Sequence, residues 1–138
     1  MPTDSPRHWR PITLGGSFPA PAGAYSPAVR AGNLLFVAGQ IPKDPMTGEI
    51  VQGDIRTQTR RVLDNLRLVL EAGGATLDDV VSVSVFLADA NDWGAFNEVY
   101  RDILRPPYPA RTAVGAQLRG ILVEINAIAI LPKDRAST

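Results

Sequence analysis

The chain has 138 residues, of which 45% are hydrophobic and 20% charged, a size and balance typical of one globular domain. Its 14 Lys and Arg residues offset 14 Asp and Glu residues, so net charge favours neither nucleic acid nor an anionic membrane as a partner. The absence of cysteine excludes disulfides, thiolate metal sites and a cysteine nucleophile. His8 is the only histidine, so we expect no histidine triad and no multi-histidine metal site within one chain.

Residues 1–22 are rich in proline and contain two adjacent glycines, which predicts an extended or partly disordered N-terminal arm. The first ten residues lack the apolar core of a signal peptide, and no apolar run approaches the ~20 residues that cross a bilayer. We therefore expect a soluble cytoplasmic protein. Its folded domain is predicted over residues 23–132, followed by a polar tail over 133–138.

A turn signal at Gly32-Asn33 separates the short segments Ala28–Arg30 and Leu34–Ala38, which predicts an antiparallel hairpin. The second segment shows no apolar–polar alternation, so it is predicted to be a strand buried on both faces. Pro42 and the residues after it predict a loop, with at most a short strand over Glu49–Val51.

Apolar side chains at helical spacing predict two helices. The first begins after Asp54, a favourable N-cap, and ends at Gly73-Gly74. The second begins at Asp89, with Asp92 three residues later, and ends before Pro106. Between them, the β-branched segment Val80–Leu87 predicts a strand.

The last two predicted strands, over residues 109–118 and 121–130, flank Arg119-Gly120, where glycine favours the turn of an antiparallel hairpin. A two-residue or a four-residue loop would put Arg111, Glu124 and Asn126 on one face of the sheet, because directly opposed side chains share a face. A three-residue loop would break this arrangement, since a one-residue slip turns every side chain to the other face.

A guanidinium, a carboxylate and a carboxamide on one face suit a small carboxylate ligand with one positioned water. The alternative is an Arg–Glu pair on a solvated sheet face, worth at most about 1 kcal/mol. Tyr25, Asn97 and the backbone near Gly39 are further candidates. Tyr25 would equally suit an aromatic anchor in a strand, and Asn97 an exposed helix position. The sequence has no phosphate-binding glycine motif, nucleophile elbow or metal-ligand spacing.

The predicted element order is β-β-(β)-α-β-α-β-β, where the bracket marks the short segment 49–51. This order fits an α+β fold with one mixed sheet and two helices on one face. Such a sheet leaves its other face uncovered, so a chain of this size would expose apolar surface unless subunits associate.

Short segments resemble the RidA/YjgF family of 2-iminobutanoate/2-iminopropanoate, or enamine/imine, deaminases, which is also called the translation-inhibitor or endoribonuclease L-PSP family. They occur in the family order from about residue 23 to residue 130. The segments include Gly23–Pro27, Ala38–Pro42, Asn97–Tyr100, Pro109–Thr112 and Glu124–Ala129.

The resemblance implies a chorismate-mutase-like fold and a homotrimer with three clefts between subunits. It implies that Arg111 binds the substrate carboxylate, and that Glu124 holds the attacking water with the backbone carbonyl near Ala113. Of the two loops above, the four-residue one sets Ala113 opposite Glu124 and is therefore favoured. The other residues implied to line the cleft, some from the neighbouring chain, are Tyr25, Gly39 and Asn97.

The implied reaction is hydrolysis of a 2-aminoacrylate-type imino or enamino acid to a 2-keto acid and ammonia, with no metal or organic cofactor. Asn126 replaces an acidic residue of the family pattern. The Gln117–Leu122 hairpin is shorter than usual in the family, and because this loop borders the cleft, substrate preference stays open. So do three other functions: a trimeric module that binds small carboxylates without turnover, a deaminase of a larger enamine (an aminomuconate or a pyrimidine-degradation intermediate), and a ribonuclease. Arg111 argues against the first and the zero net charge against the last.

Overall fold

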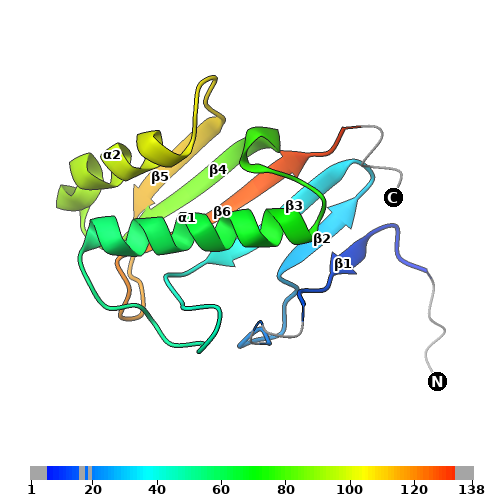
Figure 1. The fold of residues 1–138 in the computed structure, drawn as a ribbon, viewed down its shortest axis with the longest axis horizontal. Helices are drawn as coiled ribbons and strands as arrows, with labels where there is room; N and C mark the ends of the chain where they lie inside the picture. Colours follow the sequence, from blue (N-terminus) through cyan, green and yellow to red (C-terminus); the bar gives the residue numbers. More distant parts are fainter. Residues whose placement is uncertain (1–5, 16–17, 19, 133–138) are drawn as a thin grey trace.

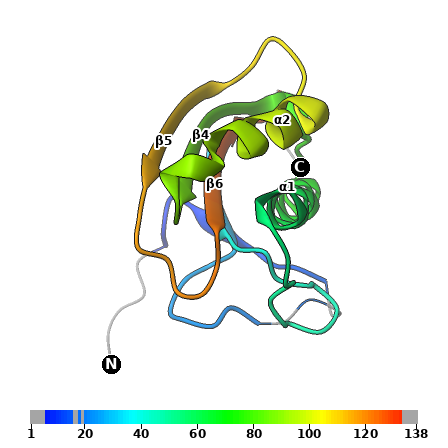
Figure 2. The same cartoon turned by 90° about the vertical axis from the view of Figure 1, so that its left-hand side faces the viewer.

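The computed structural model describes residues 6–15, 18 and 20–132, so the predicted tail over 133–138 lies outside the described residues. Within them, a six-stranded sheet has the strand order β1-β2-β3-β6-β4-β5. Two helices, α1 (Ile55–Ala72) and α2 (Trp93–Ile103), lie on the same side of this sheet (Figures 1 and 2). The predicted fold class, one mixed sheet with two helices on one face, is confirmed.

The N-terminal half of the sheet contains the predicted hairpin. Strands β2 (Ala28–Ala31) and β3 (Leu34–Gln40) pair antiparallel, and Gly32 in the turn has a φ of 61°, which suits glycine. Strand β1 (Arg10–Ile12) pairs with β2 at the edge of the sheet. The sheet therefore begins inside the segment predicted as an arm, before residue 23.

The segment between β3 and α1 is a loop, as predicted. In place of a short strand over residues 49–51, the structure has a single bridge between Lys43 and Ile50. The loop ends at Asp54, whose side chain accepts a hydrogen bond from the Thr57 backbone N–H at 2.9 Å. This hydrogen bond is the main cause that lowers the pKa of the Asp54 carboxyl. It fixes the start of α1 at the predicted N-cap.

Both helices turn an apolar side to the sheet. α1 buries Val62, Leu66 and Val69, and α2 buries Phe96 and Val99. A 3-10 turn at Leu77–Asp79 leads from α1 into β4 (Val80–Leu87), whose bounds are those predicted, and a second at Ala90–Asp92 leads from β4 into α2. Neither helix in the described part of the chain is long and apolar enough to cross a membrane.

The last two strands, β5 (Ala110–Gly115) and β6 (Val123–Ile130), do not pair with each other. Strand β4 lies between them, parallel to β5 and antiparallel to β6. The predicted hairpin of residues 109–118 and 121–130 is therefore wrong. The connection passes the end of β4, where the Ala116 N–H donates to the Leu87 carbonyl at 2.9 Å and the Ala88 N–H to the Leu122 carbonyl at 3.0 Å.

The central position of β4 has a physical reason. Between β5 and β6 the β-branched strand β4 has a hydrogen-bonded ladder on both of its edges, and the shorter strand β5 takes the edge of the sheet. Gly120, with a φ of 72°, does reverse the chain, but inside a longer connection. The residues 116–122 are enough to span two strand spacings, roughly 10 Å.

The face of the sheet opposite the helices is partly exposed and apolar. Phe36, Val114 and Ile130 keep 41%, 43% and 44% of their surface accessible. The prediction that 34–38 is buried on both faces is thus wrong for one chain: Leu35 and Val37 are buried, whereas Phe36 is exposed on the open face. An apolar surface of this kind is typical of association between subunits.

The position of Leu66 gives a test of the core. Leu66 is fully buried, so Leu66→Ala should leave a cavity and lower the free energy of unfolding by about 2–5 kcal/mol. The same change at Leu68, which is partly exposed on the same helix, should cost about 1 kcal/mol or less. Urea unfolding followed by far-UV circular dichroism measures both, and equal losses would contradict this packing.

Candidate functional site

Glu124 lies on β6 with its side chain on the open face of the sheet, because its neighbours Val123 and Ile125 are buried on the helix face. Its carboxylate lies against Gly39 of β3. A Cβ on Gly39 would overlap that carboxylate and would lie 3.3 Å from the Glu124 Cγ. Gly39 sits at an irregularity in the β3–β6 ladder, between Val37 and Gln40. Because Gly39 has no side chain, the Glu124 carboxylate has room to lie against the backbone of β3.

A cavity of about 370 Å³ opens beside this carboxylate, and we call it the Glu124 cavity. Three predicted site residues line it, namely Tyr25, Gly39 and Glu124. Tyr25 is 53% exposed at its rim. Leu14 and Phe18 of the N-terminal arm add apolar walls. The cavity thus combines the Glu124 carboxylate with several apolar side chains, and Lys43, Gln40 and Asn65 also line it.

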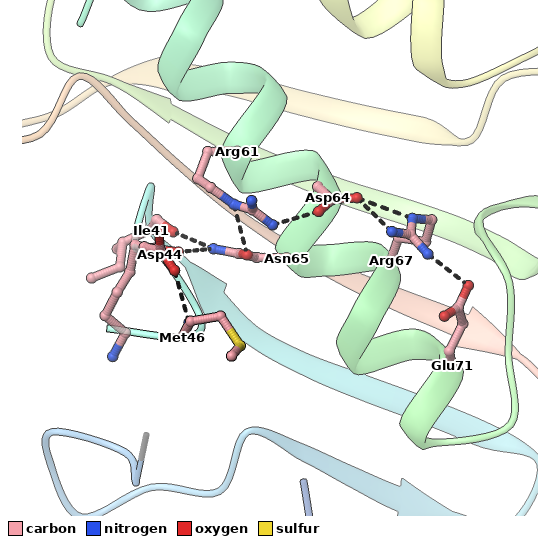
Figure 3. Close-up of polar contacts among 9 residues, drawn as sticks. Ile41, Asp44, Met46, Arg61, Asp64, Asn65, Arg67 and Glu71 are labelled. Atoms are coloured by element: carbon pink, nitrogen blue, oxygen red, sulfur yellow. Dashed lines mark hydrogen bonds and ion pairs between the residues drawn. The ribbon is translucent and has the colours of Figure 1, made fainter. Parts of the chain in front are cut away.

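Asn65 of α1 holds the segment that follows Gly39. Its Nδ2 donates to the Ile41 carbonyl at 3.1 Å and to the Lys43 carbonyl at 2.8 Å (Figure 3). Arg61 donates from Nε to the Asn65 Oδ1 at 3.1 Å, which fixes the orientation of the amide. Asn65 is 8% exposed, so these hydrogen bonds satisfy a buried polar group and tie the loop to α1.

Gln58, two turns earlier on α1, holds the segment that precedes Glu124. Its Oε1 accepts a hydrogen bond from the Leu122 N–H at 2.8 Å, and its Nε2 donates to the Val51 carbonyl at 3.0 Å. Sequence reasoning missed Gln58 and Asn65. The signal was present, since both amides interrupt the buried side of the predicted helix, where a polar residue needs a partner.

Arg111 lies on β5, where its guanidinium covers aromatic rings of α2. The guanidinium carbon is 4.7 Å from the ring centroid of Tyr100, 5.7 Å from that of Trp93 and 5.8 Å from that of Phe96. Cation–π contacts hold a guanidinium in place without neutralising its charge. Arg111, Asn97 and Tyr100 line a second cavity of about 430 Å³, which we call the Arg111 cavity.

Tyr100 contributes a buried hydroxyl near this cavity. Among the residues that the structure describes, this hydroxyl has no hydrogen-bond partner, although Tyr100 is only 4% exposed. Burial raises the pKa of the Tyr100 hydroxyl, while the nearby Arg111 charge acts in the opposite direction. A donor without a partner among the described residues therefore lies buried near the Arg111 guanidinium.

The prediction that Arg111 and Glu124 share a face of the sheet is wrong within one chain. Arg111 pairs with Val83, which is buried on the helix face, whereas Glu124 pairs with Phe86 on the open face. The physical reason is the insertion of β4. The prediction assumed direct β5–β6 pairing, and the intervening strand sets a different register.

The predicted contact between the Ala113 carbonyl and Glu124 also does not form within one chain. Ala113 pairs with Val85 of β4, and this strand separates it from Glu124. Asn126 does lie on the open face with Glu124, opposite Ser84. Five predicted site residues therefore fall into two groups: Tyr25, Gly39 and Glu124 line one cavity, and Asn97 and Arg111 line the other. Ala113 lines neither of these cavities.

Comparison with known proteins identifies the family. The family described as Endoribonuclease L-PSP matches residues 16–131. A RutC family protein of Pyrococcus horikoshii is 53% identical over 113 residues, which cover 80% of this chain and 90% of the relative. The chain belongs to the RidA/YjgF family.

Other relatives in the RidA/YjgF family have names that state an activity. The 2-iminobutanoate/2-iminopropanoate deaminase of Rattus norvegicus is 41% identical over 123 residues, covering 88% of this chain and 90% of the relative. The crystal structure of RidA from an Antarctic Psychrobacter matches with a TM-score of 0.82 and 39% identity, covering 88% of this chain and 100% of that one. The predicted family and its fold are therefore confirmed.

The close approach of Gly39 and Glu124 gives a second test. In Gly39→Ala the new methyl group meets the end of a flexible side chain, so the carboxylate should move while the fold persists. We expect the melting temperature to fall by no more than about 5 °C. A crystal structure should show the displaced carboxylate. Gly94→Ala is the control, because a Cβ there meets no atom within 4 Å. An undisplaced carboxylate or loss of folding in Gly39→Ala would contradict the geometry.

Proposed function

We propose that the protein is a hydrolytic deaminase of reactive 2-imino and 2-enamino acids of the 2-aminoacrylate type, producing a 2-keto acid and ammonia. The carrying observation is the pair of half-sites: a guanidinium held by aromatic rings and a carboxylate beside a cavity. The activity named for the relative of Rattus norvegicus supports the same reaction at family level.

Arg111 binds the substrate carboxylate in this proposal. Among the described residues it has no carboxylate partner, and its planar fork can form two parallel hydrogen bonds to one. The rings of Trp93 and Tyr100 hold the guanidinium in position before substrate arrives. Fixing the carboxylate positions the imine carbon relative to the attacking water, and positioning of this kind supplies much of such a rate gain.

Glu124 acts as the general base. It takes a proton from water as the water oxygen bonds to the imine carbon, which forms a carbinolamine. The imine reacts in its protonated form, so this addition gives a neutral carbinolamine. Glu124 then returns the proton to the carbinolamine nitrogen, the C–N bond breaks with its electron pair leaving on ammonia, and Glu124 takes the proton of the hydroxyl group as the carbonyl forms. Water is the only co-reactant, and no electrons are transferred to or from an external group. Gly39 keeps the carboxylate in position by leaving room for it.

We also propose that the protein is a homotrimer whose clefts lie between subunits. Within one chain the two half-sites lie on opposite faces of the sheet, so a complete site needs a second chain. In a ring of identical chains each contact joins two different surfaces, which allows the Arg111 half of one chain to meet the Glu124 half of the next. The exposed Phe36, Val114 and Ile130 supply apolar surface for such contacts.

The reaction is tested with an amino-acid oxidase that generates 2-imino acids of increasing side-chain size, while semicarbazide traps the imine that remains. The wild type should speed imine loss, and Arg111→Ala and Glu124→Ala should each lower kcat/KM by about 100-fold or more. Arg105→Gln is the control, because Arg105 pairs with Asp78 outside both cavities.

Two outcomes would contradict the deaminase. In one, folded wild type leaves every imine unchanged while 2-oxo acids still raise its melting temperature, which indicates a carboxylate-binding module without turnover. In the other, both variants keep wild-type activity, which removes Arg111 and Glu124 from the reaction. Activity on large enamines but not on small imines would select the larger-enamine deaminase.

The shared site is tested by mixing subunits. We expect Arg111→Ala and Glu124→Ala chains each to be inactive when assembled alone. In a mixed assembly, a site between the two kinds of chain can combine the intact Arg111 of the Glu124→Ala chain with the intact Glu124 of the Arg111→Ala chain. Refolding the two variants together in equal amounts should restore about a quarter of wild-type activity, because one site in four is then intact on random assembly. A mixture as inactive as each variant alone would contradict a site shared between chains.

A further inference from the structure

Arg101 follows Tyr100 on α2 and lines the Arg111 cavity. Its side chain is exposed, and among the described residues it forms no ion pair with a carboxylate. Arg111 shares both properties. The cavity therefore carries two cationic side chains whose charges no acidic side chain in the described part of the chain offsets.

The acidic side chains of α2 are engaged elsewhere. Glu98 forms an ion pair with Arg56, and Asp102 forms one with Arg60 at 3.6 Å, so both reach towards α1. The residues that line the cavity are Asn97, Tyr100, Arg101, Tyr108, Pro109 and Arg111, and no carboxylate is among them. The acidic side chains of α2 therefore lie on the side facing α1, and Arg101 lies on the side facing the cavity.

The Tyr100 hydroxyl is an independent sign of a ligand. It is a buried donor without a partner among the described residues, and a buried polar group normally has one. Arg111 and Tyr108, which both line the cavity, lie close to the Tyr100 ring: the guanidinium carbon is 4.7 Å and the Tyr108 ring centroid 6.5 Å from its centroid. A bound anion would supply the missing acceptor.

We propose that the Arg111 cavity binds two carboxylates of one substrate, so that the protein prefers dicarboxylic 2-imino acids. Arg111 holds the carboxylate next to the imine, and Arg101 holds the distal one. A monocarboxylate leaves one of these two cations without a counter-charge, whereas a dicarboxylate pairs both. A volume of about 430 Å³ is within the range of small-molecule sites. The preference for imino acids rests on the proposed deaminase, but dianion binding does not need turnover.

The binding test uses 2-oxoglutarate and 2-oxobutanoate as probes, measured by isothermal titration calorimetry on the full-length assembled protein. Wild type should bind 2-oxoglutarate about ten-fold more tightly than 2-oxobutanoate. Arg101→Gln should remove this difference by weakening 2-oxoglutarate alone, and Arg111→Gln should weaken both probes. Arg105→Gln is the control. It removes the same positive charge from an arginine that already pairs with Asp78, so it should not change the affinity for either probe.

Tyr100→Phe separates a ligand-binding role from a structural one. Removing a buried hydroxyl that has no partner should leave the melting temperature equal or higher, while the affinity for both probes falls about three-fold or more. A lower melting temperature with unchanged affinity would show that the hydroxyl is structural, and it would remove this donor from the site.

Two outcomes overturn the dicarboxylate site: equal affinity of wild type for both probes, or an Arg101→Gln variant that keeps the preference. The semicarbazide assay with 2-iminoglutarate and 2-iminobutanoate distinguishes this failure from that of the deaminase. If the binding preference is present but neither imine is hydrolysed, the deaminase fails and the dianion site stands. If both imines are hydrolysed without an Arg101-dependent preference, the deaminase stands and the dianion site fails.

Discussion

The pairing of β4 with both β5 and β6 is the constraint on which the rest of the structure depends. This pairing provides hydrogen-bond partners on both edges of the β-branched strand β4. It also makes the connection from β5 to β6 pass around the end of β4. It also determines which face each site residue occupies. Arg111 is on the helix face beneath α2, and Glu124 is on the open face beside Gly39. The separation of the two half-sites is thus a consequence of strand order.

Each half-site is held by a different kind of interaction. At the Glu124 cavity, the backbone segments are tied to α1 by the buried amides of Asn65 and Gln58, and the absent side chain at Gly39 sets the carboxylate. At the Arg111 cavity, aromatic rings hold a charge that they cannot neutralise. α1 therefore positions the half-site that contains the carboxylate, and α2 the half-site that contains the guanidinium.

This division connects assembly with chemistry. A single chain has the Glu124 carboxylate on one face of the sheet and the Arg111 guanidinium on the other. In the proposed trimer, an apolar sheet face and two half-sites would be completed by the same association. Activity would then depend on subunit contacts as much as on the side chains, and substrate preference on the charges that α2 turns towards the cavity.

The sequence by itself determined the elements and the candidate residues. Caps and glycines mark α1, β-branched residues mark β4, and the Gly32 turn marks the β2–β3 hairpin, because these signals act over a few residues. The family segments identified Arg111 and Glu124 as candidates. Only the tertiary structure decided that β4 separates them, because the ladder between β4 and β5 joins segments far apart in the chain and turn chemistry does not encode it. It likewise decided which carbonyls the buried amides of α1 would meet.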